Sequence, residues 1–132
     1  MKITVDTNVL IRAVVRDDPR QAAAADKILK SAEIIAVTLP CLCEFVGVLR
    51  RLYKFQPAEI ANAIRVLAET ANVALNRPAV EAGLSALNAG GDFADGLIAY
   101  EGRWLGAEKF VSFDKKAVTL LARQGCKTRL LS

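Results

Sequence analysis

The 132-residue chain contains no histidine, and this absence removes several kinds of chemistry. Histidine supplies the general base of serine and cysteine hydrolases and the imidazole ligand of most zinc enzymes. Three cysteines are present, Cys41, Cys43 and Cys126, and an odd number disfavours a disulfide framework. Three thiols without imidazole also disfavour a structural zinc site. Polar chemistry in this chain must therefore use carboxylates, hydroxyls, Lys and Arg side chains or a bound cation.

Long apolar runs are also missing. No stretch approaches the roughly 18 residues of a membrane span, and the first apolar run, Ile3–Val5, already ends at Asp6, so no signal peptide is predicted. Hydrophobic residues make up 53% and charged residues 24% of the chain, which is a globular composition. We therefore expect one soluble, cytoplasmic domain over residues 1–132. The net charge of +4 fits either a polyanionic partner such as RNA or ordinary solubility.

Short apolar segments alternate with segments of helical periodicity. The pattern predicts strands at 2–5, 33–38, 72–75, 109–113 and 127–131. It predicts helices at 7–15, 19–31, 41–53, 57–70, 78–88, 92–105 and 115–124. This alternation is typical of an α/β fold with a mainly parallel sheet.

Two acidic residues directly follow predicted strands. Asp6 comes after the first strand and Asp114 after the fourth. In parallel sheets the carboxyl ends of the strands share one edge, where ligands bind, so both carboxylates are candidate site residues. The alternative is structural, because each aspartate also stands where it would cap the helix that follows.

The predicted helix 92–105 carries two more acids, Asp92 and Asp95. Two apolar faces predict that this helix is mostly buried; they consist of Phe93, Leu97, Tyr100 and Trp104, and of Ala94, Ile98 and Leu105. The remaining sector sets the acids beside small residues that let another backbone or a ligand approach closely: Asp92, Asp95, Gly96, Ala99, Gly102 and Arg103. The alternative is that Asp92 caps the helix and the pair forms a salt bridge with Arg103.

Glu44 lies on the predicted helix 41–53, away from its apolar stripe. That stripe consists of Leu42, Phe45, Val46, Leu49 and Leu52. Periodicity alone therefore predicts a solvated position for Glu44, near Arg51, and assigns it no catalytic role.

Gathered in one pocket, these acids would repel one another unless they were protonated or bridged by a cation. Oxygen ligands favour Mg²⁺ or Mn²⁺ over zinc. Such an ion lowers the pKa of a bound water and neutralises charge on a phosphoryl group. The acids therefore suggest metal-assisted chemistry on an anionic phosphodiester.

Four segments carry a resemblance to a known family: V5-D6-T7-N8-V9-L10, C43-E44-F45, D92-F-A-D95-G-L-I-A99 and S112-F-D114-K115. In order and spacing the chain resembles the PIN-domain ribonucleases, and most closely the VapC toxins of toxin–antitoxin pairs. The resemblance implies a Rossmann-like, three-layer α/β/α fold with a mainly parallel sheet of about five strands. It also implies an endoribonuclease that depends on Mg²⁺ or Mn²⁺.

The same resemblance suggests roles for individual residues. The family's catalytic acids fall on Asp6, Glu44, Asp95 and Asp114. Asp6, Asp95 and Asp114 would hold the metal, while Glu44 would position or deprotonate a water or bind a second cation. Auxiliary positions around the site are Asp92, Thr7, Asn8 and Ser112. Gly96 departs from the family's usual alanine, and Lys116 replaces an acid found in some members.

Candidates for RNA binding are Lys115, Arg12, Arg50 and Arg51. The expected partners are an RNA substrate and a cognate antitoxin, in a homodimer or a toxin–antitoxin hetero-oligomer. Two alternatives remain open. One is a non-catalytic PIN-like interaction module whose acids serve as caps or in salt bridges. The other is a haloacid-dehalogenase-like phosphatase, which would need an aspartate where Asn8 stands.

Overall fold

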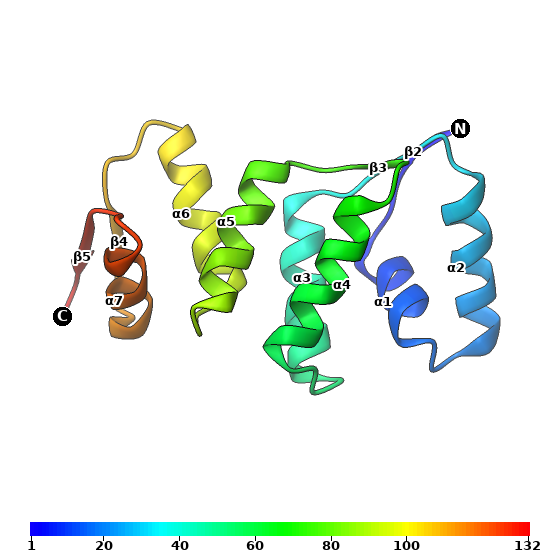
Figure 1. Cartoon of the computed structure of the whole chain (residues 1–132), viewed down its shortest axis with the longest axis horizontal. Coiled ribbons are helices and arrows are strands. Elements are labelled where there is room, and N and C mark those ends of the chain that lie inside the picture. The colour runs from blue at the N-terminus through cyan, green and yellow to red at the C-terminus, as the bar shows by residue number, and fades with distance from the viewer. The chain divides into compact units, whose positions relative to one another are not determined.

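A computed structural model describes residues 1–132 and contains seven helices and five strands in alternation (Figure 1). In chain order they are β1 (Lys2–Thr4), α1 (Thr7–Val15), α2 (Pro19–Ser31), β2 (Ile34–Ala36), α3 (Leu39–Arg51), α4 (Pro57–Glu69), β3 (Val73–Ala74), α5 (Arg77–Asn88), α6 (Phe93–Trp104), β4 (Phe110–Ser112), α7 (Lys115–Arg123) and β5 (Thr128–Leu130). None of the helices combines the length and the apolar character that a membrane-spanning segment requires.

Local capping signals set where the helices begin. The Asp6 side chain accepts a hydrogen bond from the Val9 N–H at the start of α1. Asp18 caps α2 in the same way, and Pro19 occupies its first position, where no N–H is needed. Helix α3 begins two residues earlier than predicted because Thr38 is its cap, so that Pro40 already lies in its first turn.

The chain divides into two compact units, residues 1–76 and residues 77–132, and each is described by itself. In the N-terminal unit, β1 pairs with β2 and β2 with β3, with Ile35 opposite both Ile3 and Val73. In the C-terminal unit, β4 pairs with β5, with Val111 opposite Arg129. All of these pairings are parallel, so the predicted α/β fold with five parallel strands is confirmed, with the strands in two sheets. The prediction of a single domain stays a prediction.

The core of the N-terminal unit is formed largely by α3 and α4. The apolar stripe predicted for α3 is buried at Leu42, Phe45, Val46 and Leu49. The stripe was extended too far, since Leu52 follows the last helical residue and is 69% exposed. Glu44 is exposed, as the periodicity predicts.

Helices α5 and α6 of the C-terminal unit lie side by side and pack closely (Figure 1). The Phe93 ring of α6 lies against Gly83 of α5, where an added Cβ would be 2.7 Å from the ring. Gly96 of α6 in turn faces α5, and a Cβ there would be 2.5 Å from the Ala82 carbonyl oxygen and 2.7 Å from the Ala86 Cβ. Each helix therefore uses a glycine to admit the other.

One prediction about α6 is wrong. The helix is not mostly buried: Phe93 and Leu97 are buried, but Ile98, Trp104 and Leu105 are 54%, 80% and 80% exposed. Of the two groups expected to approach the small residues, a backbone or a ligand, the one at Gly96 is the α5 backbone. Periodicity identified the apolar positions of the helix but not which of them has a neighbouring element to pack against.

Candidate functional site

Two predicted acids of the N-terminal unit gather around the first turns of α1 and α3. We call Asp6, Thr7, Cys41 and Glu44 the N-terminal acidic cluster. The Thr7 hydroxyl donates a 3.0 Å hydrogen bond to Glu44 Oε2 and lies 4.0 Å from Cys41 Sγ. The charges of both Asp6 and Glu44 act on the Cys41 thiol. The link from Thr7 to Glu44 therefore brings together side chains that lie 37 positions apart in the sequence.

The surroundings of the Cys41 thiol favour its protonated form. Burial raises its pKa, the hydrogen bond with Thr7 acts in the opposite direction, and the charges of Asp6 and Glu44 raise it further. Since the thiolate is the reactive form of cysteine, we expect this thiol to be inert in the folded chain.

We therefore expect iodoacetamide to alkylate Cys41 several-fold more slowly than Cys126, which is less buried. The reaction is run near neutral pH in EDTA and followed by mass spectrometry of the digested protein. In denaturant the difference should disappear. Alkylation of folded Cys41 as fast as that of Cys126 would contradict the described environment.

The remaining predicted acids come together in the C-terminal unit. We call Asp92, Asp95, Asp114 and Ser112 the C-terminal acidic cluster. The pKa of Asp95 is raised, first by burial of its side chain and then by the negative charges of Asp92 and Asp114. Asp92 and Asp114 are thus close enough for their charges to act on Asp95. Ser112 holds the turn before α7, because its hydroxyl accepts a 2.9 Å hydrogen bond from the Asp114 N–H.

Three acids of the two clusters also cap helices, as the alternative interpretation of these residues as helix caps predicts. Asp6, Asp92 and Asp114 each accept backbone N–H groups at the start of α1, α6 and α7. In every case the accepting atom is Oδ1, so these bonds do not use Oδ2. Capping and cation binding are therefore compatible at the same carboxylate. The alternative salt bridge between Asp95 and Arg103 is not formed.

The donor atoms of both clusters are of the kind that hard cations bind. Each cluster offers carboxylate and hydroxyl oxygens, which suit Mg²⁺ and Mn²⁺. The pKa of Asp95 is raised by burial first and then by the charges of Asp92 and Asp114, and a divalent cation bound there would favour its ionised form. No three His, Cys, Asp or Glu side chains of the chain are arranged to hold one ion. The residues of the C-terminal acidic cluster thus fit a hard cation in chemistry.

The candidate RNA-binding cations differ in how they are held. The Arg12 guanidinium already binds Asp17 Oδ1 at 2.9 Å, Gln21 Oε1 at 2.6 Å and the Tyr53 hydroxyl oxygen at 3.3 Å. Beside it, Asn8 is exposed at the start of α1 and lines a groove between α1 and α2 together with Arg12.

The other three candidates, Lys115, Arg50 and Arg51, are exposed. The Arg51 guanidinium folds back over Gly47, where a Cβ would be 2.7 Å from its Nη2. The roles of all four cations in RNA binding stay predictions.

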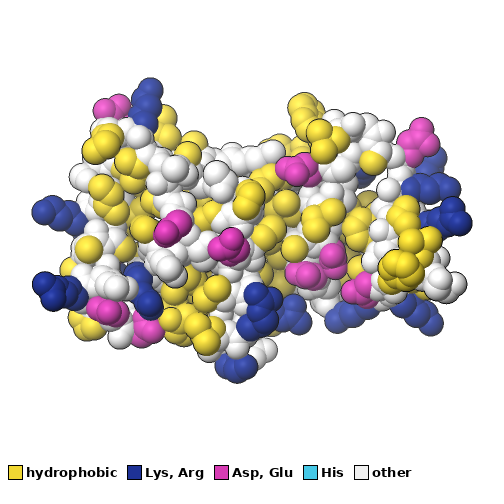
Figure 2. Space-filling model, turned by 180° about the vertical axis from the view of Figure 1, so that it is seen from behind, with side chains coloured by type: hydrophobic (Ala, Val, Ile, Leu, Met, Phe, Trp, Pro, Cys, Tyr) yellow, Lys and Arg dark blue, Asp and Glu magenta, His cyan; other side chains and the backbone are white.

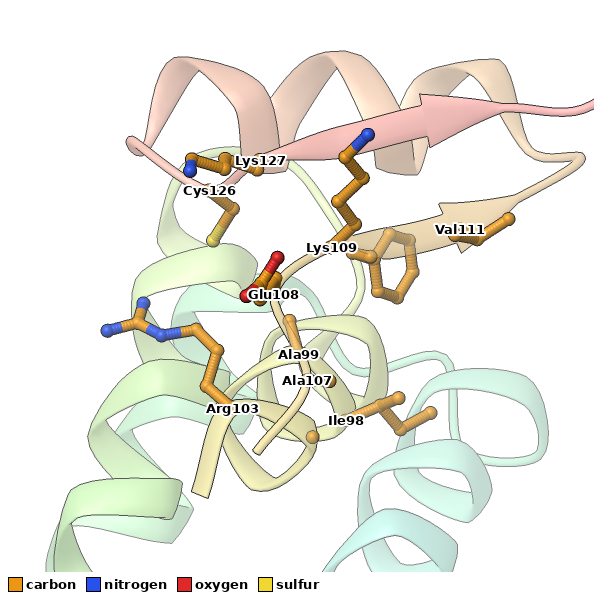
Figure 3. Close-up of a pocket in the computed structure, with 11 residues that line it drawn as sticks. Ile98, Ala99, Arg103, Ala107, Glu108, Lys109, Val111, Cys126 and Lys127 are labelled. Atoms are coloured by element: carbon orange, nitrogen blue, oxygen red, sulfur yellow. The ribbon is translucent and has the colours of Figure 1, made fainter. Parts of the chain in front are cut away.

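One hollow of about 230 Å³ contains none of the predicted site residues (Figure 3). It lies at the amino-terminal ends of β4 and β5, at the opposite end of β4 from Asp114. Figure 3 shows Arg103, Glu108, Lys109 and Lys127 around it. Its residues are scattered over 98–127, so no sequence motif indicated it.

A comparison with protein-family models gives one match, to the PIN domain, over residues 3–120. The matched range includes the acids of both clusters. A search of curated proteins finds no match. Because the family match covers most of the sequence, the chain belongs to the PIN-domain family.

Proposed function

We propose that this chain is an endoribonuclease that depends on Mg²⁺ or Mn²⁺ and acts as the toxin of a toxin–antitoxin pair. PIN-domain proteins are typically metal-dependent nucleases and typically bind Mg²⁺. The observation that carries the proposal is the raised pKa of Asp95 beside Asp92 and Asp114. A partly buried carboxylate that feels two further negative charges, beside a serine hydroxyl, suits a divalent cation, and capping alone does not account for Asp95.

In this proposal, which takes its ligand set from the family resemblance, Asp6, Asp95 and Asp114 would hold the cation. When bound, the ion lowers the pKa of a water molecule and neutralises charge on the scissile phosphate. Glu44 accepts a proton from the attacking water, and Thr7 fixes that carboxylate by its bond to Oε2, leaving Oε1 to take the proton. The water attacks phosphorus in line with the leaving 3′ oxygen and produces 5′-phosphate and 3′-hydroxyl ends.

The test is cleavage of total cellular RNA by the purified chain. We expect cleavage with Mg²⁺ or Mn²⁺ and none once EDTA has removed the metal, with 5′-phosphate at the new ends. A preparation of the Asp114→Asn variant, purified in parallel, serves as the control for contaminating nucleases. Equal cleavage with and without EDTA would contradict the proposed chemistry.

The toxin role rests on the resemblance of the four motifs to VapC toxins, and its partners would be a cognate antitoxin and a second copy of the chain. Induced expression in a bacterial host should stop growth, whereas expression of the Asp114→Asn variant should not. Normal growth together with RNA cleavage in vitro would support the proposed nuclease activity and contradict the proposed role as a toxin.

One alternative function is favoured by a specific observation. Because Asp6, Asp92 and Asp114 all cap helices, a non-catalytic interaction module would account for their positions. Calorimetric titration separates the two functions, since a module has no need to bind Mg²⁺ at millimolar concentration. No observation favours a haloacid-dehalogenase-like phosphatase. Such an enzyme requires an aspartate at the position where this chain has Asn8.

A further inference from the structure

Helix α7 borders a groove, and of the residues that line it the sequence motifs include only Lys115. The groove has a volume of about 500 Å³ and lies between α7 and the end of α5. Its lining residues come from two short segments: Ala89, Lys115, Lys116, Thr119, Leu120, Arg123 and Gln124. On a helix, Lys116, Thr119 and Arg123 share one face, and Lys116 and Arg123 are two turns apart, about 10 Å.

The charge of this groove is of one sign. It is lined by three cations, Lys115, Lys116 and Arg123, and by no carboxylate. All three side chains are exposed, and none forms a salt bridge. The face shown in Figure 2 carries both acidic and basic side chains. The groove therefore presents positive charge that no side chain neutralises, beside the polar hydroxyl of Thr119.

The groove lies directly beside the C-terminal acidic cluster. Two short stretches of the chain contribute residues to both. On one side, the Lys116 N–H donates a 2.9 Å hydrogen bond to Asp114 Oδ1. On the other side, Ala89 lines the groove and only the two glycines 90 and 91 separate it from Asp92. The groove and the C-terminal acidic cluster are thus neighbours at both of these points of the chain.

The walls of the groove are fixed by packing. The Leu120 side chain lies against Gly91, where a Cβ would be 2.6 Å from Leu120 Cδ1, so α7 approaches this loop closely. At the far end, the Gln124 amide donates to both the carbonyl and the hydroxyl oxygen of Ser85 at 3.2 Å. The cations of α7 are therefore presented from a supported helix rather than from a loop.

We propose that this groove binds the sugar-phosphate backbone of single-stranded RNA and leads it to the C-terminal acidic cluster. The inference rests on the proposed function, since it supplies the substrate path for that site. Separate phosphates pair with Lys116 and Arg123, while Thr119 between them donates to a phosphate oxygen. An acidic peptide would match the same charges, but the adjoining carboxylates, with their cation, act on a phosphodiester and not on a peptide.

The experiment measures binding of a fluorescein-labelled oligouridylate of about 12 nucleotides to the full chain in EDTA, where no cleavage occurs. Anisotropy is recorded from roughly 50 to 200 mM KCl, because each phosphate contact contributes about 0.7 to the slope of log K against log salt for a single strand. The double variant Lys116→Gln/Arg123→Gln should lower that slope by about 1.4. These side chains are exposed, so the fold is retained.

The matched control is Lys109→Gln/Lys127→Gln, which removes the same two charges at the hollow in Figure 3. It should leave the slope unchanged. An equal fall of the slope in both double variants would mean that only net charge matters, and it would overturn the proposal that RNA binds in the groove. An unchanged slope in the groove variant, with lost binding of a labelled hexaglutamate, would assign the groove to a peptide and overturn the RNA path.

The two proposals fail separately. If wild type binds oligouridylate through the groove but cuts no RNA with Mg²⁺, the proposed nuclease activity is wrong and the proposed RNA binding in the groove is retained. If cleavage depends on the acids while the groove variant keeps the wild-type slope, the proposed nuclease activity is retained and the proposed RNA binding in the groove is wrong.

Discussion

Replacement of Asp114 by asparagine is expected to lower Mg²⁺-dependent RNA cleavage by at least about 100-fold. Asparagine is also a good N-cap, so its side-chain oxygen can still accept from the Lys116 and Ala117 N–H groups that Asp114 now binds. Helix α7 is therefore preserved while the negative charge that would attract the cation is lost. The measurement is the initial rate of cleavage of a labelled RNA at saturating Mg²⁺.

The matched control is Asp18→Asn, because Asp18 caps α2 in the same manner and belongs to neither acidic cluster. This variant should cut RNA at the wild-type rate. Full activity of Asp114→Asn, or an equal loss in Asp18→Asn, would remove Asp114 from the catalytic machinery.

The variant Asp95→Asn allows a second measurement, the free energy of unfolding, which separates loss of function from loss of the fold. The pKa of Asp95 is raised in the folded chain, so its ionised form costs stability once the pH rises above the ordinary carboxyl range. In EDTA at neutral pH the variant should therefore be more stable than wild type, by roughly 0.5 kcal/mol after allowance for solvent screening. At a pH below the ordinary carboxyl range the difference should vanish. Loss of cleavage together with a gain in stability would identify a residue kept for function.

The second large effect is structural. Gly96→Val should lower the free energy of unfolding by about 3 kcal/mol, because α5 already fills the space into which the side chain would project. The nearest atom is a backbone oxygen, that of Ala82, which cannot rotate away as a side chain can. Urea unfolding followed by circular dichroism measures the change.

Gly102→Val is the control on the same helix. A Cβ at Gly102 has its nearest neighbour at 3.9 Å, the Ala107 Cβ, so the substitution should change stability by less than roughly 0.5 kcal/mol. Equal losses in both variants would mean that valine is costly anywhere on α6 and that its approach to α5 is not tight.

Signals that act over a few residues made most of the fold predictable. Helices α1 and α2 have the predicted bounds, because Asp6, and Asp18 with Pro19, are start signals that need no distant partner. The burial of α6 could not be predicted in the same way. Ile98 and Leu105 have the right spacing for a buried face, but a helical wheel does not reveal whether a neighbouring element covers it.

The candidate site divides along the same line. Asp6 and Asp114 could be proposed from the sequence because they directly follow predicted strands; in the structure one residue separates each from the end of its strand. Glu44 was placed only by resemblance, since its exposed position gives no signal and its partner Thr7 is 37 residues away. The cations of the α7 groove were missed as a set because only the neighbouring α5 gives them a common wall.

The reciprocal use of Gly83 and Gly96 has a consequence for the acids at the start of α6. Each glycine admits a group of the opposite helix, so sliding either helix along its axis would drive Phe93 into a side chain or α6 into the α5 backbone. The hairpin thus has a single axial register. Asp92 and Asp95 are therefore held at a fixed height on it, so binding an ion there would require little loss of conformational freedom at these two positions.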